Sequence, residues 1–206
     1  MDEKWIQWVR RLQAIAQNGL LYNENEFDQA RYRDIQQIAA EILTSDTNCR
    51  TQDVIDIFNR EKGYATPKVA VRGGVFQDNK ILLVREILDG RWSLPGGWAD
   101  PNESPSHSIE REIWEESGFK TKCMKLAAVY DRSMHAHYPP FPYHVYKLFF
   151  VCDLTGGEAK LSNETDGVEF FPENELPELS TPRVTQEQIL RLFEHYRHPE
   201  LPTDFD

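Results

Sequence analysis

Carboxylates are crowded into one short stretch of the chain, GGWADPNESPSHSIEREIWEESGF at residues 96–119. Glu115 and Glu116 follow Glu112 by three and four residues, so a helix would place all three side chains on one face within a single turn. Like charges at these spacings destabilise an isolated helix by about 0.2–0.5 kcal/mol per pair. Mg²⁺ or Mn²⁺ would offset this repulsion, because hard divalent cations take oxygen ligands from clustered carboxylates.

The same stretch carries the signals of a helix with defined ends. Ser104 and Pro105 predict its start, because serine caps free backbone N–H groups and proline suits the first helical position. Gly118 predicts its end. The preceding LPGGW segment is a glycine-rich loop whose backbone can approach a ligand closely. The alternative interpretation of such a helix is a solvated acidic face.

Residues 97–119 resemble the signature of the Nudix hydrolases in every fixed position. That signature is a glycine, five residues, a glutamate, seven residues, Arg-Glu, an aliphatic residue, any residue, Glu-Glu, any residue, a glycine and an aliphatic or aromatic residue. It is met here by Gly97, Glu103, Arg111, Glu112, Ile113, Glu115, Glu116, Gly118 and Phe119. The resemblance implies an α/β fold, an α/β/α sandwich around a mixed sheet. It also implies hydrolysis of a pyrophosphate linkage with a divalent metal, Mg²⁺ or Mn²⁺.

The resemblance also implies roles for the matching residues. Glu112, Glu115 and Glu116 are expected to be catalytic metal ligands, together with the carbonyl of Gly97. Glu103 and Arg111 are expected to form an ion pair that supports the loop against the helix. Asp100 and Glu110 are expected to be solvated and to take no part in the site.

Many family members use a further carboxylate from a loop later in the domain. The segment LSNETDGVEFF resembles that region, and we expect Glu164 to be the additional catalytic residue, a general base or ligand. Asp166 is the competing candidate. Both could instead be ordinary turn residues, because the assignment depends only on their spacing to the strand VEFF.

Candidate substrate-binding residues lie outside the signature. Arg72 and Arg85, on two expected strands, could reach a phosphate or could form surface or structural ion pairs. Trp98 could stack on a base or cover an edge of the core. Tyr143 belongs to DRSMHAHYPPFPYHVY, a loop rich in aromatic residues and stiffened by prolines, which could contact the substrate.

Apolar periodicity divides the chain into a helical part, residues 1–63, and a mixed α/β part, residues 67–206. In the first helix, Trp5, Val9, Leu12 and Ala16 form an apolar stripe with Trp8 and Ile15 beside it, and Asn18-Gly19 is expected to end the helix. Two further amphipathic helices follow. They contain no catalytic pattern, so packing or dimerisation, giving a homodimer, is their expected role, with a contribution to the substrate pocket as the alternative.

Composition restricts the binding partners and the cellular location that we expect for this protein. The formal net charge of the 206 residues is −11, which disfavours non-specific binding to nucleic acid or anionic lipid. The three cysteines lack the spacing of a zinc site or a disulfide framework. The segment MDEKWIQWVRRLQ does not resemble a secretory signal, and no long apolar run follows, so a soluble cytoplasmic protein without membrane contact is expected.

The helical start, followed by NEFDQARYRDI and a TPKV entry to the second part, resembles a Nudix subgroup that hydrolyses X-linked nucleoside diphosphates. This resemblance implies a pyrophosphohydrolase acting on a nucleoside diphosphate linked to another moiety, CDP-choline or a related alcohol or sugar derivative, with CDP-choline slightly preferred over ADP-ribose. Two alternatives stay open: processing of RNA ends, and a ligand-sensing module without catalysis. The intact set of carboxylates speaks against the sensing module.

Overall fold

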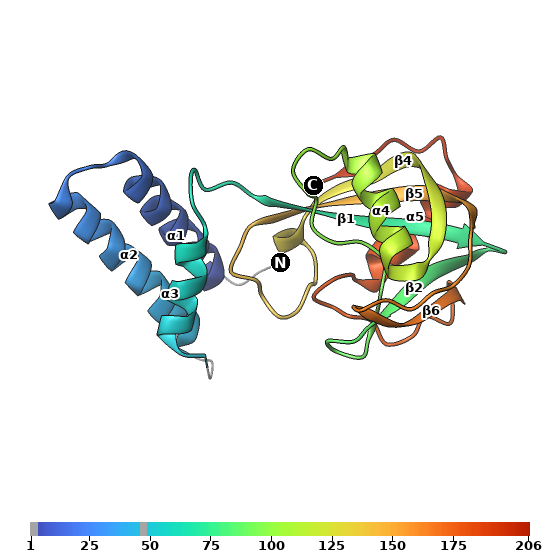
Figure 1. Cartoon of the computed structure of the whole chain (residues 1–206), viewed down its shortest axis with the longest axis horizontal. Helices are drawn as coiled ribbons and strands as arrows, with labels where there is room; N and C mark the ends of the chain where they lie inside the picture. The colour runs from blue at the N-terminus through green and yellow to red at the C-terminus, as the bar shows by residue number, and fades with distance from the viewer. Residues whose placement is uncertain (1–3, 46–48) are drawn as a thin grey trace. The chain divides into compact units, whose positions relative to one another are not determined.

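The computed structural model describes residues 4–45 and 49–206. Contacts divide the chain into two compact units (Figure 1). The helical unit contains Met1–Pro67 and Pro140–His144, and the sheet unit contains Lys68–Pro139 and Val145–Asp206. A short segment between two strands of the sheet unit is therefore part of the helical unit.

The helical unit is built from three amphipathic helices, α1 (Lys4–Tyr22), α2 (Glu26–Thr44) and α3 (Thr51–Arg60). Asn25 caps α2 by accepting hydrogen bonds from the backbone N–H groups of Phe27 and Asp28. Buried apolar residues from all three helices form one cluster, which consists of Ile6, Val9, Ala39, Ala40, Val54 and Phe58.

Two details of α1 differ from the sequence prediction. The helix does not end at Asn18-Gly19 but continues to Tyr22. A Cβ atom on Gly19 would lie 2.3 Å from the ring of Tyr32, so this glycine allows close helix packing rather than ending the helix. In addition, Trp8 and Ile15 are 55% and 51% exposed, although they lie beside the buried stripe.

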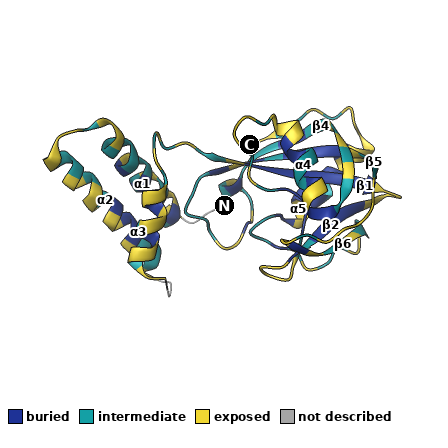
Figure 2. Ribbon diagram, in the orientation of Figure 1, coloured by how far each residue is buried: buried dark blue, intermediate teal, exposed yellow. Residues whose placement is uncertain are grey.

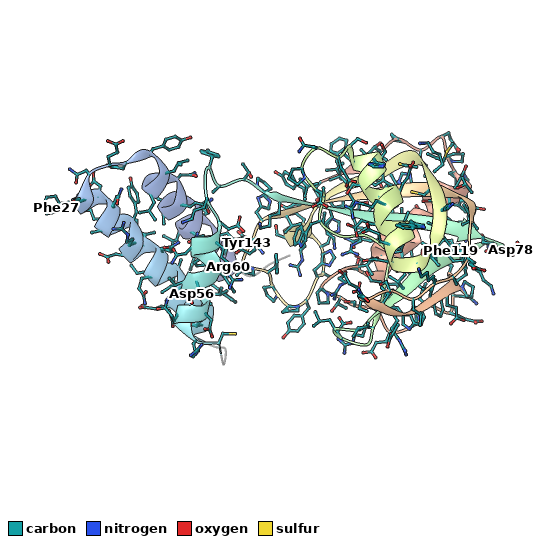
Figure 3. All side chains as sticks on the ribbon, in the orientation of Figure 1. Phe27, Asp56, Arg60, Asp78, Phe119 and Tyr143 are labelled. Atoms are coloured by element: carbon teal, nitrogen blue, oxygen red, sulfur yellow. The ribbon has the colours of Figure 1, made fainter. Side chains whose placement is uncertain are left out.

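The segment Pro140–His144 is bound to the helices by side-chain and backbone contacts. The hydroxyl of Tyr143 donates a 3.2 Å hydrogen bond to the carbonyl of Ile57 in α3 (Figure 3). Arg10 of α1 donates to the carbonyl of Phe141, with its Nε at 3.0 Å. The expected contact of Tyr143 with substrate stays a prediction, and the structure places this side chain against α3.

The sheet unit contains one mixed, seven-stranded sheet. Its strands are β1 (Lys68–Gln77), β2 (Lys80–Glu86), β3 (Trp92–Ser93), β4 (Phe119–Asp131), β5 (Val145–Gly157), β6 (Thr165–Pro172) and β7 (Asp204–Phe205). The order is β3-β2-β1-β5-β4-β7, with β6 paired to β2. Strands β1 and β5 are parallel and β4 and β5 antiparallel, while a turn at Asp78 and Asn79, both with positive φ, joins β1 to β2.

Helices cover both faces of this sheet. Alternate side chains of β1 point to opposite faces, so Val71 and Val75 pack under α4 (Pro105–Ser117), while Phe76 packs under α5 (Gln186–Arg197). The two resulting cores are the buried layers of Figure 2. A short 3₁₀ helix, Arg132–Met134, follows β4. Among the described residues, no helix is both long and apolar enough to cross a membrane.

Candidate active site

Helix α4 begins and ends where its sequence signals predict. Ser104 accepts a hydrogen bond from the backbone N–H of His107 at 3.3 Å, and Pro105 is the first helical residue. Gly118 ends the helix in the left-handed conformation, with a φ of 78°. Because Ile109 and Ile113 are buried against the sheet, the orientation of α4 is fixed and its glutamates face one side of the unit.

The glycine-rich loop runs beside the first half of β1 like an additional strand. The N–H of Val71 donates to the carbonyl of Gly97 at 2.9 Å, and the N–H of Gly73 donates to the carbonyl of Pro95 at 2.9 Å. Gly96 has a φ of 139°, and a Cβ at this position would lie 2.1 Å from the carbonyl oxygen of Val71. Only glycine can therefore hold the loop this close to β1.

Glu116 is the most deeply buried of the clustered carboxylates, with 6% of its surface exposed. One of its oxygens accepts a 2.9 Å hydrogen bond from the backbone N–H of Gly96. Burial raises the pKa of this carboxyl group to about 8, although the charge of Arg72 and the Gly96 hydrogen bond both oppose the rise. The charged form of Glu116 is therefore costly in this buried position.

Glu112 and Glu115 share one partner. Nη1 of Arg111 donates to an oxygen of Glu112 at 3.0 Å and to an oxygen of Glu115 at 2.9 Å. The carboxylate of Glu112 also lies against Gly97, where a Cβ would be 2.7 Å from its Oε2. Burial raises the pKa of Glu112, and the charge of Arg111 opposes this rise. Arg111 therefore joins Glu112 to Glu115, and Glu112 in turn lies beside Gly97.

The ion pair between Glu103 and Arg111 is present. Nε of Arg111 lies 3.0 and 3.1 Å from the two oxygens of Glu103, so the contact fixes both side chains. Asp100 also contacts Arg111, at 3.3 Å, and Glu110 accepts a 2.8 Å hydrogen bond from the N–H of Cys123. The Glu110 side chain is only 20% exposed, so its expected solvation is wrong, because β4 folds against it. The Asp100 side chain is 66% exposed, as expected, but Asp100 lines the cavity described below.

A cavity of about 440 Å³ lies in front of these carboxylates. It is lined by Gly97, Trp98, Asp100, Arg111, Glu112, Glu115, Glu116, Ser162, Asn163 and Glu164. Trp98 is half-exposed at the wall of this cavity. The structure thus brings Glu164 to the same cavity as the clustered glutamates, Gly97 and Trp98, although Glu164 lies far from them in the sequence.

Two of the four candidate substrate contacts are held elsewhere in the sheet unit. Arg85 forms a 2.7 Å ion pair with Asp166, with both side chains partly exposed. Arg72 is buried and donates hydrogen bonds to the backbone carbonyls of Leu94 and Gly96. Neither arginine lines the cavity. Their phosphate contacts remain predictions, and Asp166 has a partner away from the carboxylates.

The loop before β6 contributes to the lining of the cavity. The carbonyl of Glu164 accepts a 2.9 Å hydrogen bond from the N–H of Ile87, which ties this loop to the end of β2. Ser162 and Asn163 line the cavity beside Glu164, and sequence reasoning missed both. Their only sequence signal is their place in the SNET turn next to Glu164.

The oxygen atoms of this site are of the chemical type that binds a hard divalent cation. Carboxylate oxygens of Glu112, Glu115 and Glu116 are what Mg²⁺ and Mn²⁺ bind. The Gly97 carbonyl, already bonded to Val71, has a second lone pair to offer. As the side chains stand, no group of three potential ligands among the described residues surrounds one point, because Arg111 holds Glu112 and Glu115.

Comparison with protein families agrees with this geometry. Residues 66–193 match the family model of the NUDIX domain, and residues 3–58 match a model described as a UDP-X-like, N-terminal oligomerisation domain. This chain is a Nudix hydrolase. The expected helical domain and the α/β/α sandwich around a mixed sheet are confirmed, and the Nudix hydrolase is a pyrophosphatase.

The Nudix hydrolase has relatives that match it over most or all of its length. A Bacillus subtilis (strain 168) protein named "Putative ADP-ribose pyrophosphatase YjhB" is 43% identical over 206 residues, which cover 100% of this chain and 99% of the relative. An "ADP-ribose pyrophosphatase" of Methanocaldococcus jannaschii is 37% identical over 123 residues, which cover 57% of this chain and 69% of the relative.

Solved structures give the same picture. A structure titled as a UDP-X diphosphatase has a TM-score of 0.64 and 32% identity to the Nudix hydrolase, and the match covers 98% of each chain. An ADP-ribose pyrophosphatase from Streptococcus suis has a TM-score of 0.63 and 38% identity, covering 68% of this chain and 100% of the other.

Proposed function

We propose that the chain hydrolyses the pyrophosphate bond of a nucleoside diphosphate linked to a second moiety, with ADP-ribose as its substrate. One observation carries the proposal: Glu112, Glu115 and Glu116 line a single cavity together with Glu164. The relatives named as ADP-ribose pyrophosphatases support ADP-ribose over CDP-choline, which the sequence resemblance had placed slightly ahead.

In this proposal, Glu112, Glu115 and Glu116 hold the divalent metal, with the carbonyl of Gly97. A metal bound there would neutralise the pyrophosphate and lower the pKa of an attacking water. Glu164 lines the same cavity, where it can accept a proton from the water. Trp98 offers an aromatic face to the base or sugar of the substrate, and the nearby Ser162 and Asn163 offer polar groups to its hydroxyls.

A substrate panel tests the proposal. Purified protein is assayed with Mg²⁺ and with Mn²⁺ on ADP-ribose, CDP-choline, nucleotide sugars, dinucleoside polyphosphates and capped RNA. We expect ADP-ribose to give AMP and ribose 5-phosphate with the highest kcat/KM. A higher kcat/KM on CDP-choline or capped RNA would reassign the substrate, and no hydrolysis of any compound would overturn the proposal.

We also propose that the helical unit joins two copies of the chain. Trp8 and Ile15 are seven residues apart and lie on the same face of α1, where both are about half exposed. The matching family model is described as an oligomerisation domain, which supports this role. Large exposed apolar side chains on one helix face are suited to cover the same face of a second copy.

A further inference from the structure

Arg72 is the one arginine of β1, and it is buried, with 8% of its surface exposed. Its Nη1 donates a 3.0 Å hydrogen bond to the carbonyl of Leu94 and a second hydrogen bond to the carbonyl of Gly96. These carbonyls lie two residues apart on the glycine-rich loop. Nη1 of Arg72 therefore holds two residues of the loop, Leu94 and Gly96, against β1.

Gly96 links these hydrogen bonds of Arg72 to the carboxylate cluster. Its carbonyl accepts from Arg72, while its N–H donates to Glu116 at 2.9 Å. Because the peptide bond is planar, holding the carbonyl of Gly96 fixes the plane that it shares with the nitrogen of Gly97. Gly97 lies against the carboxylate of Glu112. The position of two glutamates is thus coupled to one guanidinium.

The charge of Arg72 acts on the same residues. A guanidinium with so little exposure is costly unless anions compensate it. Its charge lies in the field of the buried carboxylates Glu116 and Glu86, both of which favour its charged form. Glu86 in turn forms a 3.0 Å ion pair with Arg183. Glu116, Arg72 and Glu86 are therefore buried charges of alternating sign that act on one another.

We propose that Arg72 is a positioning residue for the metal site, which holds the Gly96–Gly97 loop and orients Glu116 without touching substrate. This inference rests on the proposed function, because it takes Glu116 as a metal ligand. It replaces a phosphate contact by Arg72 with an indirect role: the side chain does not line the cavity, and Nη1 is occupied by backbone carbonyls.

Metal affinity is the decisive measurement, because a substrate contact or a general contribution to folding would not change it in the folded protein. Mn²⁺ binding to the full chain is measured by electron paramagnetic resonance without substrate. Residues that orient metal ligands typically change metal affinity by about 10–100-fold when they are mutated. We expect Arg72→Met to weaken Mn²⁺ binding by about this factor and to lower kcat, with little change in KM at saturating metal.

Arg72→Lys is the second variant, because lysine keeps the charge but loses the planar group with several donors. It should fold even where Arg72→Met does not, and should weaken Mn²⁺ binding by an intermediate factor. Wild-type Mn²⁺ affinity in folded Arg72→Lys and Arg72→Met would overturn the proposal. A raised KM with unchanged Mn²⁺ affinity would do the same and would identify Arg72 as a substrate contact.

Lys147 provides a matched control. This basic side chain lies on the neighbouring strand β5, is 3% exposed, and donates to the carbonyl of Arg183 rather than to the glycine-rich loop. Lys147→Met should alter the thermal midpoint but not Mn²⁺ affinity. An equal loss of Mn²⁺ affinity in Lys147→Met would show that any buried basic group has this effect, and would overturn the specific role of Arg72.

Glu116→Gln separates the two proposals. If Glu116→Gln binds Mn²⁺ as tightly as the wild type, the metal-ligand assignment itself fails. If Glu116→Gln loses Mn²⁺ binding while both Arg72 variants keep it, only the positioning role fails. The two failures therefore give different results.

Discussion

Thr165 Oγ1 donates a 2.6 Å hydrogen bond to the backbone carbonyl of Glu116. This carbonyl belongs to the last turn of α4, where helix carbonyls lack an intrahelical partner. Thr165 is fully buried at the first position of β6. The Thr165 hydroxyl thus gives the Glu116 carbonyl a hydrogen-bond partner. It also joins the end of α4 to β6, the strand that directly follows Glu164.

Replacing Thr165 by valine should destabilise the Nudix unit, because the Glu116 carbonyl would be buried without a partner. The expected loss in the free energy of unfolding is about 1–3 kcal/mol. Thr165→Ser keeps the hydroxyl and should lose clearly less. Urea unfolding of both variants measures the difference, and equal losses would show that the methyl group rather than the hydrogen bond matters.

Glu116→Gln should reduce Mg²⁺-dependent kcat by more than about 100-fold, since residues that only orient metal ligands already change activity by about 10–100-fold. The fold should persist, because the amide oxygen can still accept from the Gly96 N–H. Removing a charge that is costly to bury should leave the metal-free thermal midpoint equal to or above that of the wild type. Calorimetry and steady-state kinetics together test both statements, and near-normal turnover would contradict them.

Glu164 and Asp166 can be distinguished by their amide variants. Glu164 lines the cavity, while Asp166 is paired with Arg85 at 2.7 Å. Loss of a general base typically lowers the rate by about 10²–10⁴-fold. We expect Glu164→Gln to lose kcat within that range and Asp166→Asn to lose much less, in single-turnover assays at saturating metal. The reverse order would assign the catalytic role to Asp166.

His137 should make stability depend on acid pH. Burial lowers the pKa of this imidazole to about 2, with the positive charges of Lys147, Arg132 and His135 acting in the same direction. Its Nδ1–H donates to the Thr181 carbonyl at 2.9 Å, which opposes the lowering, while its Nε2 lies 3.2 Å from the amide nitrogen of Gln188, from which only an unprotonated Nε2 can accept.

Because the folded pKa lies below the ordinary value of 6.5, the contribution of His137 is complete above pH 6.5 and is lost as the pH falls towards 2. The free energy of unfolding should fall by up to about 1.4 kcal/mol per pH unit in this window. Urea unfolding between pH 4.5 and 8 should show a shallower acid slope in His137→Asn than in the wild type. The exposed His198 is the control, and the same change of slope in His198→Asn would refute the assignment.

The proposed assembly of the helical unit depends on Trp8 and Ile15. A charged side chain at either position would have to be desolvated between two copies. Trp8→Glu should therefore shift the chain from dimer to monomer in light scattering at micromolar concentration. The surface variant Gln37→Glu, on α2, should leave the mass unchanged. A monomeric wild type, or a dimeric Trp8→Glu variant, would contradict this interface.

The sequence by itself determined the clustered glutamates as a set. Glu112, Glu115 and Glu116 fall on one face because of helical periodicity alone, and Ser104 and Gly118 mark the ends of that helix through local backbone chemistry. Family membership and fold class followed from the same short segment and are confirmed. These features depend on interactions within a few residues, which the order of amino acids fixes directly.

Only the tertiary structure decided the partners of isolated charges. Arg72 and Arg85 look alike in sequence on neighbouring strands, yet one is buried against the glycine-rich loop and the other pairs with Asp166. Glu110 likewise gained a partner when β4 folded against α4. Such contacts join segments 13–81 residues apart, so they depend on the path of the chain and on which side chains the sheet buries, and neither is encoded in local spacing.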